Sequence, residues 1–289
     1  MQARFFPWLD RSGRLSVLKL VVFASLFAPA VWIAIQYDQG WLKSDSVKSL
    51  IHETGLWAIR ILLVSLAVSP LRRIGQWNKL IAVRRMLGVA VLFYALAHLT
   101  LYVVQQRFDL VHVAGEIVLR LYLTIGFVAL LGLAALGATS TDAMIRRIGA
   151  ARWNRLHLLA YPVALLALIH FMLQTKLDVS APLLLAGLFL LEMGWRLLQR
   201  FRRGESPAAL AGLAVAAATA TALFEAAWYH LRNGIDVADV LAADLSLDDG
   251  LRPVWIVLAV GLAAVALRLA RPLWARRPAP GPRLRAAAE

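Results

Sequence analysis

Cysteine is absent from the 289 residues of this chain. Disulfide bonds, thiolate metal sites, iron–sulfur clusters and cysteine nucleophiles are therefore excluded, and any metal must be held by histidine or oxygen ligands. Charged residues are also scarce, because they make up 17% of the chain, against about 25% in average soluble proteins. Hydrophobic residues make up 61%, and this excess is collected in long apolar runs.

Several familiar catalytic motifs are missing as well. The chain has no G-x-G-x-x-G pattern after a strand, no phosphate-binding P-loop, no H-E-x-x-H pair and no nucleophile elbow. It therefore has no Rossmann fold of its own with which to take hydride from NAD(P)H.

The apolar runs predict an all-α membrane protein, a polytopic helical bundle. A helix needs about 20 apolar residues to cross the hydrocarbon core of a bilayer. Eight runs approach or reach this length, and we expect them to be transmembrane helices. They cover residues 16–36, 53–70, 86–104, 116–138, 156–173, 181–199, 208–229 and 253–270.

The net charge of +14 follows from the same topology and does not indicate nucleic-acid binding, because the basic residues flank the apolar runs. If the N-terminus is cytoplasmic, the cytoplasmic segments carry 22 Lys and Arg residues and the opposite segments carry six. This asymmetry is what the positive-inside rule expects. We therefore predict a bacterial inner-membrane protein with both termini in the cytoplasm.

The predicted organisation has four parts. Residues 1–15 form a cytoplasmic N-terminus, 16–200 a six-span core, 207–272 an added pair of Ala- and Leu-rich spans, and 273–289 a disordered basic tail. The small residues Ala28-Pro29-Ala30 would also suit a cleaved signal peptide. The apolar run continues beyond them, which favours an uncleaved first span.

Three histidines lie within predicted spans, where ionisable residues are costly and usually functional. His98 lies fourteen residues after Arg84, and His170 lies thirteen after His157, which corresponds to about 20 Å of helix in both spans. Both spans run in the same direction, so His98 and His170 have similar depth. They are the predicted bis-histidine ligands of one heme b, and His157 lies at the cytoplasmic side.

Other interpretations of these histidines remain open. A single histidine in a span can be a packing residue held by a hydrogen bond, and histidines with arginines can form the proton relay of a transporter. A structural scaffold is a third alternative. His52, His112 and His230 lie at or near the outer loops, where we expect no heme binding.

The sequence around the histidines resembles a known family. Arg84-Arg85-Met86-Leu87-Gly88 with Tyr94 and His98 is similar to the third span of the ferric-reductase-like transmembrane domain. Further similarity lies in Arg120-Leu121-Tyr122, in Thr139-Ser140, and in Trp153-Asn154-Arg155-Leu156-His157 with Tyr161 and His170. Within that superfamily, residues 15–200 most resemble the MsrQ (YedZ) family, the heme-binding membrane subunits of the periplasmic methionine sulfoxide reductase system.

The resemblance implies an electron-transfer subunit and not the catalytic subunit. Such a protein passes electrons across the inner membrane to a periplasmic molybdopterin methionine sulfoxide reductase, which repairs oxidised envelope proteins. The implied cofactors are heme b and FMN, with quinone as a candidate donor. His98 and His170 would be iron ligands, and His157 a ligand or a residue near the heme.

Two departures from related proteins are present: spans seven and eight exceed the usual six-span pattern, and the set of candidate ligands differs. Relatives with two hemes have four histidines, whereas Arg84 stands here at the depth of His157, and arginine is a poor iron ligand. Arg84 would suit a heme propionate or a flavin phosphate.

Arg120 is one turn from Glu116 and either pairs with it or meets a propionate. A ferric reductase, or a cytochrome b serving another periplasmic oxidoreductase, remains the alternative function.

Overall fold

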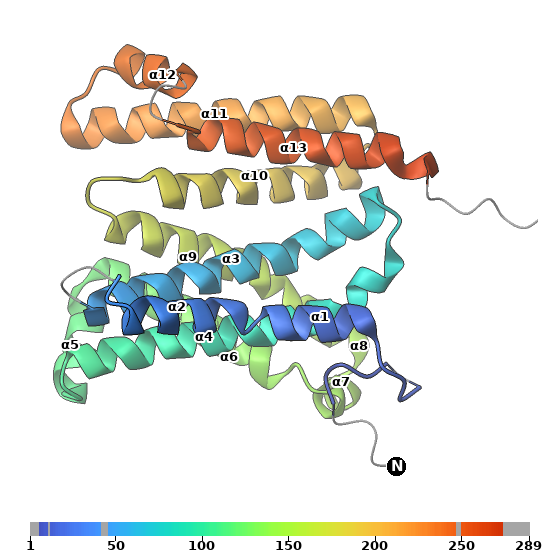
Figure 1. Cartoon of the computed structure of the whole chain (residues 1–289), viewed down its shortest axis with the longest axis horizontal. Coiled ribbons are helices and arrows are strands. Elements are labelled where there is room, and N and C mark those ends of the chain that lie inside the picture. Colours follow the sequence, from blue (N-terminus) through green and yellow to red (C-terminus); the bar gives the residue numbers. More distant parts are fainter. Residues whose placement is uncertain (1–5, 11, 42–45, 247–249, 274–289) are drawn as a thin grey trace, which may run out of the picture.

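The computed structural model describes residues 6–10, 12–41, 46–246 and 250–273. Within these ranges every regular element is a helix, apart from an isolated bridge between two residues near the N-terminus. Eight helical segments are long and apolar enough to cross a membrane, and they lie side by side along the longest axis of the molecule (Figure 1). The chain is thus a multi-pass membrane protein, as predicted.

The first span is broken near its middle. Helix α1 (Val17–Ser25) and helix α2 (Ala28–Asp38) together form the span, and Pro29 stands in the first turn of α2, where proline is tolerated because it needs no hydrogen-bond acceptor. Tyr94 bridges the break: its hydroxyl donates to the carbonyl of Leu26 at 2.8 Å and accepts from the amide of Ala30 at 3.1 Å. Polar backbone groups freed by the break are therefore satisfied inside the protein.

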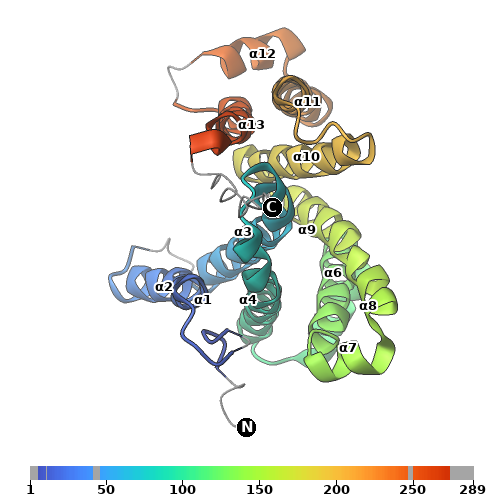
Figure 2. The ribbon, with the colours of Figure 1, turned by 90° about the vertical axis from the view of Figure 1, so that its right-hand side faces the viewer.

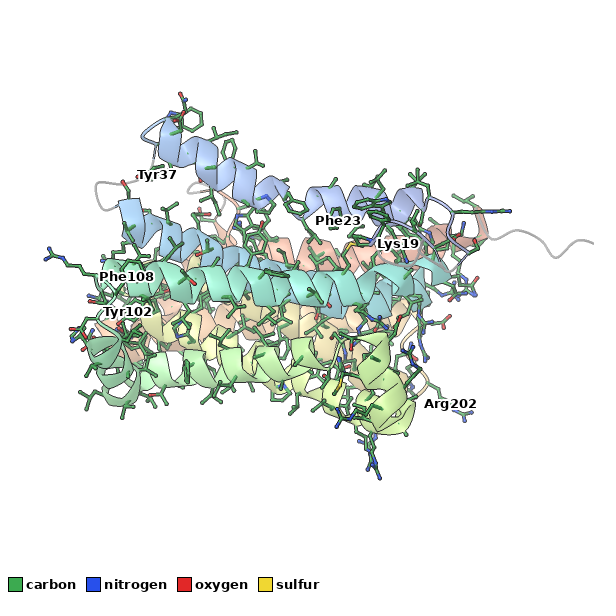
Figure 3. The ribbon with its side chains drawn as sticks, turned by 90° about the horizontal axis from the view of Figure 1, so that it is seen from below. Lys19, Phe23, Tyr37, Tyr102, Phe108 and Arg202 are labelled. Atoms are coloured by element: carbon green, nitrogen blue, oxygen red, sulfur yellow. The ribbon has the colours of Figure 1, made fainter. Side chains whose placement is uncertain are left out.

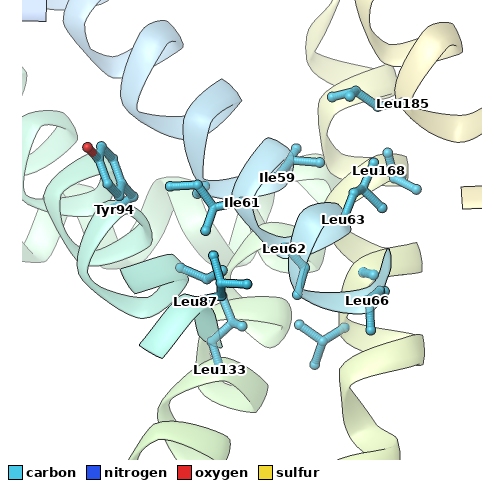
Figure 4. Close-up of a cluster of buried hydrophobic side chains, with 14 of the residues drawn as sticks. Ile59, Ile61, Leu62, Leu63, Leu66, Leu87, Tyr94, Leu133, Leu168 and Leu185 are labelled. Atoms are coloured by element: carbon cyan, nitrogen blue, oxygen red, sulfur yellow. The ribbon is translucent and has the colours of Figure 1, made fainter. Parts of the chain in front are cut away.

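The second and third spans form the central pair. Helix α3 (Ser46–Ile74) is the longest described helix, and after the short 3₁₀ helix η1 (Asn78–Val83) the chain returns as α4 (Arg84–Gln105). Twelve of the 29 residues of α3 are buried, and its apolar residues form the middle of the core. Figure 4 shows Ile59, Leu62 and Leu66 of this helix directed towards residues of the surrounding spans.

The fourth span was predicted to cover residues 116–138, and its predicted start is wrong. The chain forms a short helix α5 (Leu110–Leu119), breaks at Arg120, and continues as the spanning helix α6 (Leu121–Ala138). Arg120 has extended backbone angles (φ −107°, ψ 107°), so the two helices take different directions, and α5 lies across the end of the bundle in Figure 1. Glu116 therefore belongs to α5 and not to the span.

A pair of short helices connects the fourth and fifth spans. Helices α7 (Asp142–Ile148) and α8 (Ala150–Leu156) are followed by a 3₁₀ turn η2 (His157–Leu159) and by α9 (Ala160–Gln174). The 3₁₀ turn comes just before Pro162, whose ring disfavours a regular helix on its N-terminal side. A local change of helical twist thus occurs at His157 itself.

The remaining helices form a layer on one side of the core. Helix α10 (Ser180–Arg200) lies between the core and the antiparallel pair α11 (Pro207–Asn233) and α13 (Pro253–Ala270), and Figure 2 shows this layer above α3 and α9. The loop between α11 and α13 contains an unexpected helix, α12 (Val237–Leu245). The pair packs through small residues, since α11 is rich in buried alanine.

The two ends of the bundle differ in charge. One end, here called the arginine-rich end, contains the start of α1 and α4, the end of α3 and α10, and helices α7 and α8. The other, here called the α5 end, contains α5 and α12. Figure 3 shows Lys19 and Arg202 at the first end, and Tyr102 and Phe108 at the second. Several residues of the predicted charge count lie outside the described part of the chain, as does most of the predicted tail: Arg4, Arg11, Lys43, Arg276, Arg277, Arg283 and Arg285.

Candidate functional site

His98 lies on the side of α4 that faces α3. Its Nδ1 is 2.7 Å from the backbone carbonyl oxygen of Ile51. A carbonyl can only accept a hydrogen bond, so Nδ1 carries the proton and Nε2 keeps a free lone pair. The ring lies directly against Gly55, where a Cβ atom would be 2.8 Å from Nδ1. A glycine at this position is therefore what allows the imidazole to reach the carbonyl.

His170 repeats this arrangement between α9 and α6. Its Nδ1 is 2.7 Å from the carbonyl oxygen of Tyr122, which again leaves Nε2 as the unprotonated nitrogen. The ring lies against Gly126, where a Cβ atom would be 2.7 Å from Nδ1 and 2.8 Å from Cε1. Two helix pairs thus each hold one histidine by a carbonyl and a glycine. A hydrogen bond donated by the Nδ1–H group to a carbonyl is a usual way in which proteins orient a metal-binding imidazole.

The two imidazoles lie close together. Their ring centroids are 6.2 Å apart and the ring planes are inclined by 85°. A bond from imidazole to a metal is about 2.0–2.1 Å long, so two imidazoles on opposite sides of one ion have centroids roughly 6 Å apart. The separation of His98 and His170 therefore matches that of two axial ligands on a single metal ion.

A large cavity surrounds this pair. Its volume is about 1280 Å³, above the range of about 300–1,000 Å³ that is usual for small-molecule sites. Apolar residues of α3, α4, α6 and α9 line its deep part, and polar residues line its mouth at the α5 end: Lys48, Glu116, Arg120 and Lys176. His52 and His112 also line the cavity, although their positions in the sequence indicated ordinary loop residues.

The residues that the structure describes contain no group of three or more His, Asp or Glu side chains arranged to hold a bare metal ion. A metal between His98 and His170 would therefore need its remaining ligands from another molecule. A planar macrocycle with four nitrogen donors meets this need, and the size of the cavity suits it. The donor set and the space together fit a bis-histidine heme.

Arg120 lies at the mouth of the cavity. Its Nε is 2.6 Å from a carboxylate oxygen of Glu116, and its Nη1 donates to the hydroxyl of Tyr122 at 3.5 Å. The hydrogen bond that Arg120 donates to Tyr122 and the charge of Glu116 raise the pKa of Arg120, so the guanidinium stays charged. Of the two alternatives that the spacing left open, the structure shows the ion pair with Glu116, which joins α5 to the residue that caps its C-terminal end.

His157 lies apart from the other two histidines and does not line their cavity. Its ring stacks on Trp153 with centroids 3.8 Å apart, its Nδ1 is 3.1 Å from the carbonyl oxygen of Trp153, and its Nε2 is 3.4 Å from the hydroxyl oxygen of Ser140. Arg84 and Arg85 are the charged residues that act on it electrostatically. The structure thus places His157 and Arg84 near one another at the arginine-rich end, as their predicted depth required.

The comparisons with known proteins identify similar sequences. A family model described as "Ferric reductase like transmembrane component" matches residues 54–168, which include His98 and His157. A protein of Xanthomonas campestris pv. campestris (strain B100), named protein-methionine-sulfoxide reductase heme-binding subunit MsrQ, is 42% identical over 189 residues, which are 63% of this chain and 86% of that protein.

Two other relatives carry the same name. The protein of Rhodospirillum rubrum is 38% identical over 198 residues, which are 68% of this chain and 93% of that protein. The protein of Xanthomonas axonopodis pv. citri is 39% identical over 197 residues, which are 66% of this chain and 90% of that protein. No solved structure gives a significant match.

Proposed function

This chain belongs to the MsrQ family, and from that premise we propose that it binds heme b through His98 and His170 and passes electrons across a membrane to a methionine sulfoxide reductase. The observation that carries the proposal is the pair of imidazoles. Each has Nδ1 fixed by a backbone carbonyl, and their centroids are 6.2 Å apart inside a large cavity.

The protein residues supply ligation, orientation and exclusion of water. His98 and His170 would hold the heme iron through their Nε2 atoms, and ligation by two imidazoles suits electron transfer. The apolar walls of the cavity would cover the faces of the macrocycle. Heme, when bound, would supply one-electron redox chemistry.

The mouth of the cavity suits the propionate groups of a heme. Arg120 and Lys176 are basic residues at this mouth, and basic side chains bind carboxylates by charge-assisted hydrogen bonds. Arg120 keeps Glu116 as its partner in the structure, so a propionate would share or replace that ion pair. His157 and Arg84 would then serve the arginine-rich end, where electrons enter, either beside a second cofactor or beside the donor.

The difference in charge between the two ends of the bundle supports a direction of electron flow. We propose that the arginine-rich end faces the cytoplasm of a bacterium, in line with the positive-inside rule, and that the protein lies in the inner membrane. A quinol, or a separate flavin reductase using FMN, would donate electrons at that side. The heme would lie nearer the α5 end, where a periplasmic molybdopterin reductase could dock.

The sulfoxide chemistry would belong to that partner. Reduction of one methionine sulfoxide takes up two electrons and two protons, and it releases methionine and one water molecule. A subunit with one-electron chemistry must therefore deliver its electrons in two successive steps. This makes the chain the electron-transfer subunit of an oxidoreductase system.

Optical spectra would test the heme pair. We expect the detergent-purified wild type to show the sharp reduced α and β bands of a low-spin b-type cytochrome, and we expect His98→Ala and His170→Ala each to lose them. His112→Ala is a matched control, because His112 lines the same cavity but is not one of the two proposed ligands. A wild type that binds no heme when heme is supplied during expression would refute the proposal.

A second experiment would test the partner. The dithionite-reduced protein is mixed with a methionine sulfoxide reductase from the same organism, and a sulfoxide-containing protein is then added. Oxidation of the heme that requires both additions supports the proposed role. Heme that binds normally but stays reduced would leave a cytochrome b for another oxidoreductase as the function, which the ferric-reductase-like family match also supports.

A further inference from the structure

A second cavity lies at the arginine-rich end, remote from the histidine pair. It has a volume of about 380 Å³ and is open on one side. Arg72, which lines this cavity, lies seventeen residues after Gly55, which contacts His98. Seventeen residues correspond to about 25 Å of helix. We call it the arginine cavity. Its walls come from the ends of α3 and α10 and the start of α9, and its lining residues are Ser69, Arg72, Arg73, Tyr161, Trp195, Arg196, Gln199 and Arg200.

The arginine cavity is strongly positive. Four of its eight lining residues are arginines, and within the described part of the chain none of the four forms an ion pair. One carboxylate, that of Glu192, acts electrostatically on Arg196 from deeper in α10. The cavity therefore keeps an excess of positive charge that the described protein does not neutralise.

Part of the cavity wall is fixed by the protein itself. Arg196 donates to the carbonyl oxygens of Glu192 at 2.7 Å and Leu66 at 2.8 Å, and its guanidinium lies 4.9 Å from the ring centroid of Tyr161. These contacts join α3, α9 and α10. Arg196 is thus a rigid part of the wall and is not available as a mobile ligand.

Two hydrogen-bond donors in the cavity lack a partner. The Nε atom of Arg72 and the Nε2 atom of Gln199 are buried and have no hydrogen bond among the described residues. The amide of Gln199 is oriented by Arg73, which donates to its Oε1 at 3.3 Å, so Nε2 is a true donor. A buried donor without a partner costs about 1–3 kcal/mol. Both atoms therefore call for an acceptor, such as an anionic oxygen.

Arginines that only mark the cytoplasmic side of a span would extend into water. Here the Nε atom of Arg72 and the Nε2 atom of Gln199 are buried beside the arginine cavity. In addition, exposed apolar residues are adjacent to the arginines in the sequence. Leu71 precedes Arg72, Leu197 follows Arg196, and Phe201 follows Arg200. These apolar side chains are positioned to meet acyl chains while the guanidinium groups meet an anion. Basic pockets between transmembrane helices are known to bind anionic lipid headgroups.

We propose that the arginine cavity binds the phosphate headgroup of an anionic phospholipid, with Arg72 and Gln199 as direct donors and Arg200 as a further positive group. The headgroup would join the ends of α3 and α10 through hydrogen bonds, and its acyl chains would lie on the neighbouring apolar surface. Since α10 lies between the core and the α11/α13 pair, the bound lipid would tighten the attachment of that layer. This site is independent of heme binding.

The test compares lipids with soluble phosphate. The full-length protein is purified in detergent and delipidated, and its thermal unfolding is followed with added cardiolipin, phosphatidylcholine or inorganic phosphate at constant ionic strength. We expect cardiolipin to raise Tm by several degrees and to be retained in native mass spectra. Phosphatidylcholine and inorganic phosphate should have little effect, because one lacks net charge and the other lacks acyl chains.

The variants separate the cavity from general attraction to anionic lipid. Arg72→Gln removes a proposed donor, and Gln199→Glu places a negative charge beside it with almost no change in shape. We expect each to weaken cardiolipin binding at least tenfold. Arg146→Gln is the matched control, because Arg146 is an exposed arginine on α7 at the same end. If Arg72→Gln fails to fold, Gln199→Glu alone decides the matter.

Three results would overturn the proposal. One is a cardiolipin effect of the same size in Gln199→Glu as in the wild type and in Arg146→Gln, which would mean non-specific attraction. Another is stabilisation by inorganic phosphate equal to that by cardiolipin, which would identify a soluble phosphate compound as the ligand. The third is the absence of any effect of cardiolipin on the wild type.

Discussion

Replacing Gly126 by alanine adds one methyl group to α6 where the ring of His170 lies against the helix. The new Cβ atom would be 2.7 Å from Nδ1, 2.8 Å from Cε1 and 3.0 Å from Cγ of that ring, whereas ordinary contacts begin at 3.4 Å. The ring must therefore move by about 0.7 Å, the difference between 3.4 and 2.7 Å. Gly126→Ala thus tests the ligand geometry without changing a ligand.

A shift of this size cannot be absorbed at both ends of the imidazole. On one side Nδ1 donates to the carbonyl of Tyr122 at 2.7 Å, and on the other Nε2 must reach the iron at about 2.0 Å. Loss of such a supporting contact lowers metal affinity by about 10–100-fold. We expect Gly126→Ala to lose heme to that extent, or to keep heme with a high-spin spectrum because one axial bond is broken.

The same substitution should not harm the fold. Alanine is favoured over glycine within a helix by about 1 kcal/mol, so the helix itself gains stability. Heme content per protein and the reduced spectrum are measured alongside size-exclusion chromatography, so that loss of heme is distinguished from unfolding. Gly88→Ala on α4 is the matched control, because a Cβ atom there meets nothing within 4 Å. Wild-type heme content and band positions in Gly126→Ala would refute the reasoning.

Three further predictions concern other groups. His157→Ala should keep the low-spin bands of the histidine pair in a visible spectrum, because His157 does not line their cavity; loss of all bands would contradict this. Arg252→Ala should destabilise the protein by about 3 kcal/mol in thermal or denaturant unfolding, because it leaves the buried carboxylates of Glu225 and Asp244 without their cation, and adding Asp244→Asn should restore part of the loss. Burial raises the pKa of Asp244 above 3.8 despite the attraction of Arg252, so its contribution to stability is full below that pH and is lost as the pH rises through the folded pKa. Asp244→Asn should flatten this part of the stability–pH curve, and an unchanged slope would contradict the assignment.

The spans could be predicted from the sequence because their signal is one-dimensional: a long apolar run crosses a membrane regardless of its neighbours. The breaks within them could not be located in the same way. Pro29 interrupts the first span, and the chain stays intact there because Tyr94 on another helix satisfies the freed backbone groups. The break at Arg120 has no proline or glycine to mark it, since the residue simply adopts extended backbone angles between two helices.

The histidine pair could be predicted for a related reason. Depth in a membrane follows from counting residues along two parallel spans, and His98 and His170 have the same depth. Their supports could not be found by counting, because the carbonyls of Ile51 and Tyr122 become acceptors only where another helix approaches closely. The glycine opposite each ring permits that approach, but a single glycine in an apolar span has no distinctive pattern.

The position of His157 depends on a local change of helical twist as well as on its depth. Thirteen residues of ideal helix would turn His157 and His170 to different faces, yet both contact α6: His170 near its start, at Tyr122, and His157 just beyond its end, at Ser140. The 3₁₀ turn at His157–Leu159 supplies extra rotation per residue, and it occurs before Pro162, where a regular helix is disfavoured. Depth and proline position together therefore place both histidines against one helix. The α4 residues that act on His157 are Arg84 and Arg85, and neither can ligate iron as an imidazole does. The position at the arginine-rich end therefore lacks the second ligand of a bis-histidine pair.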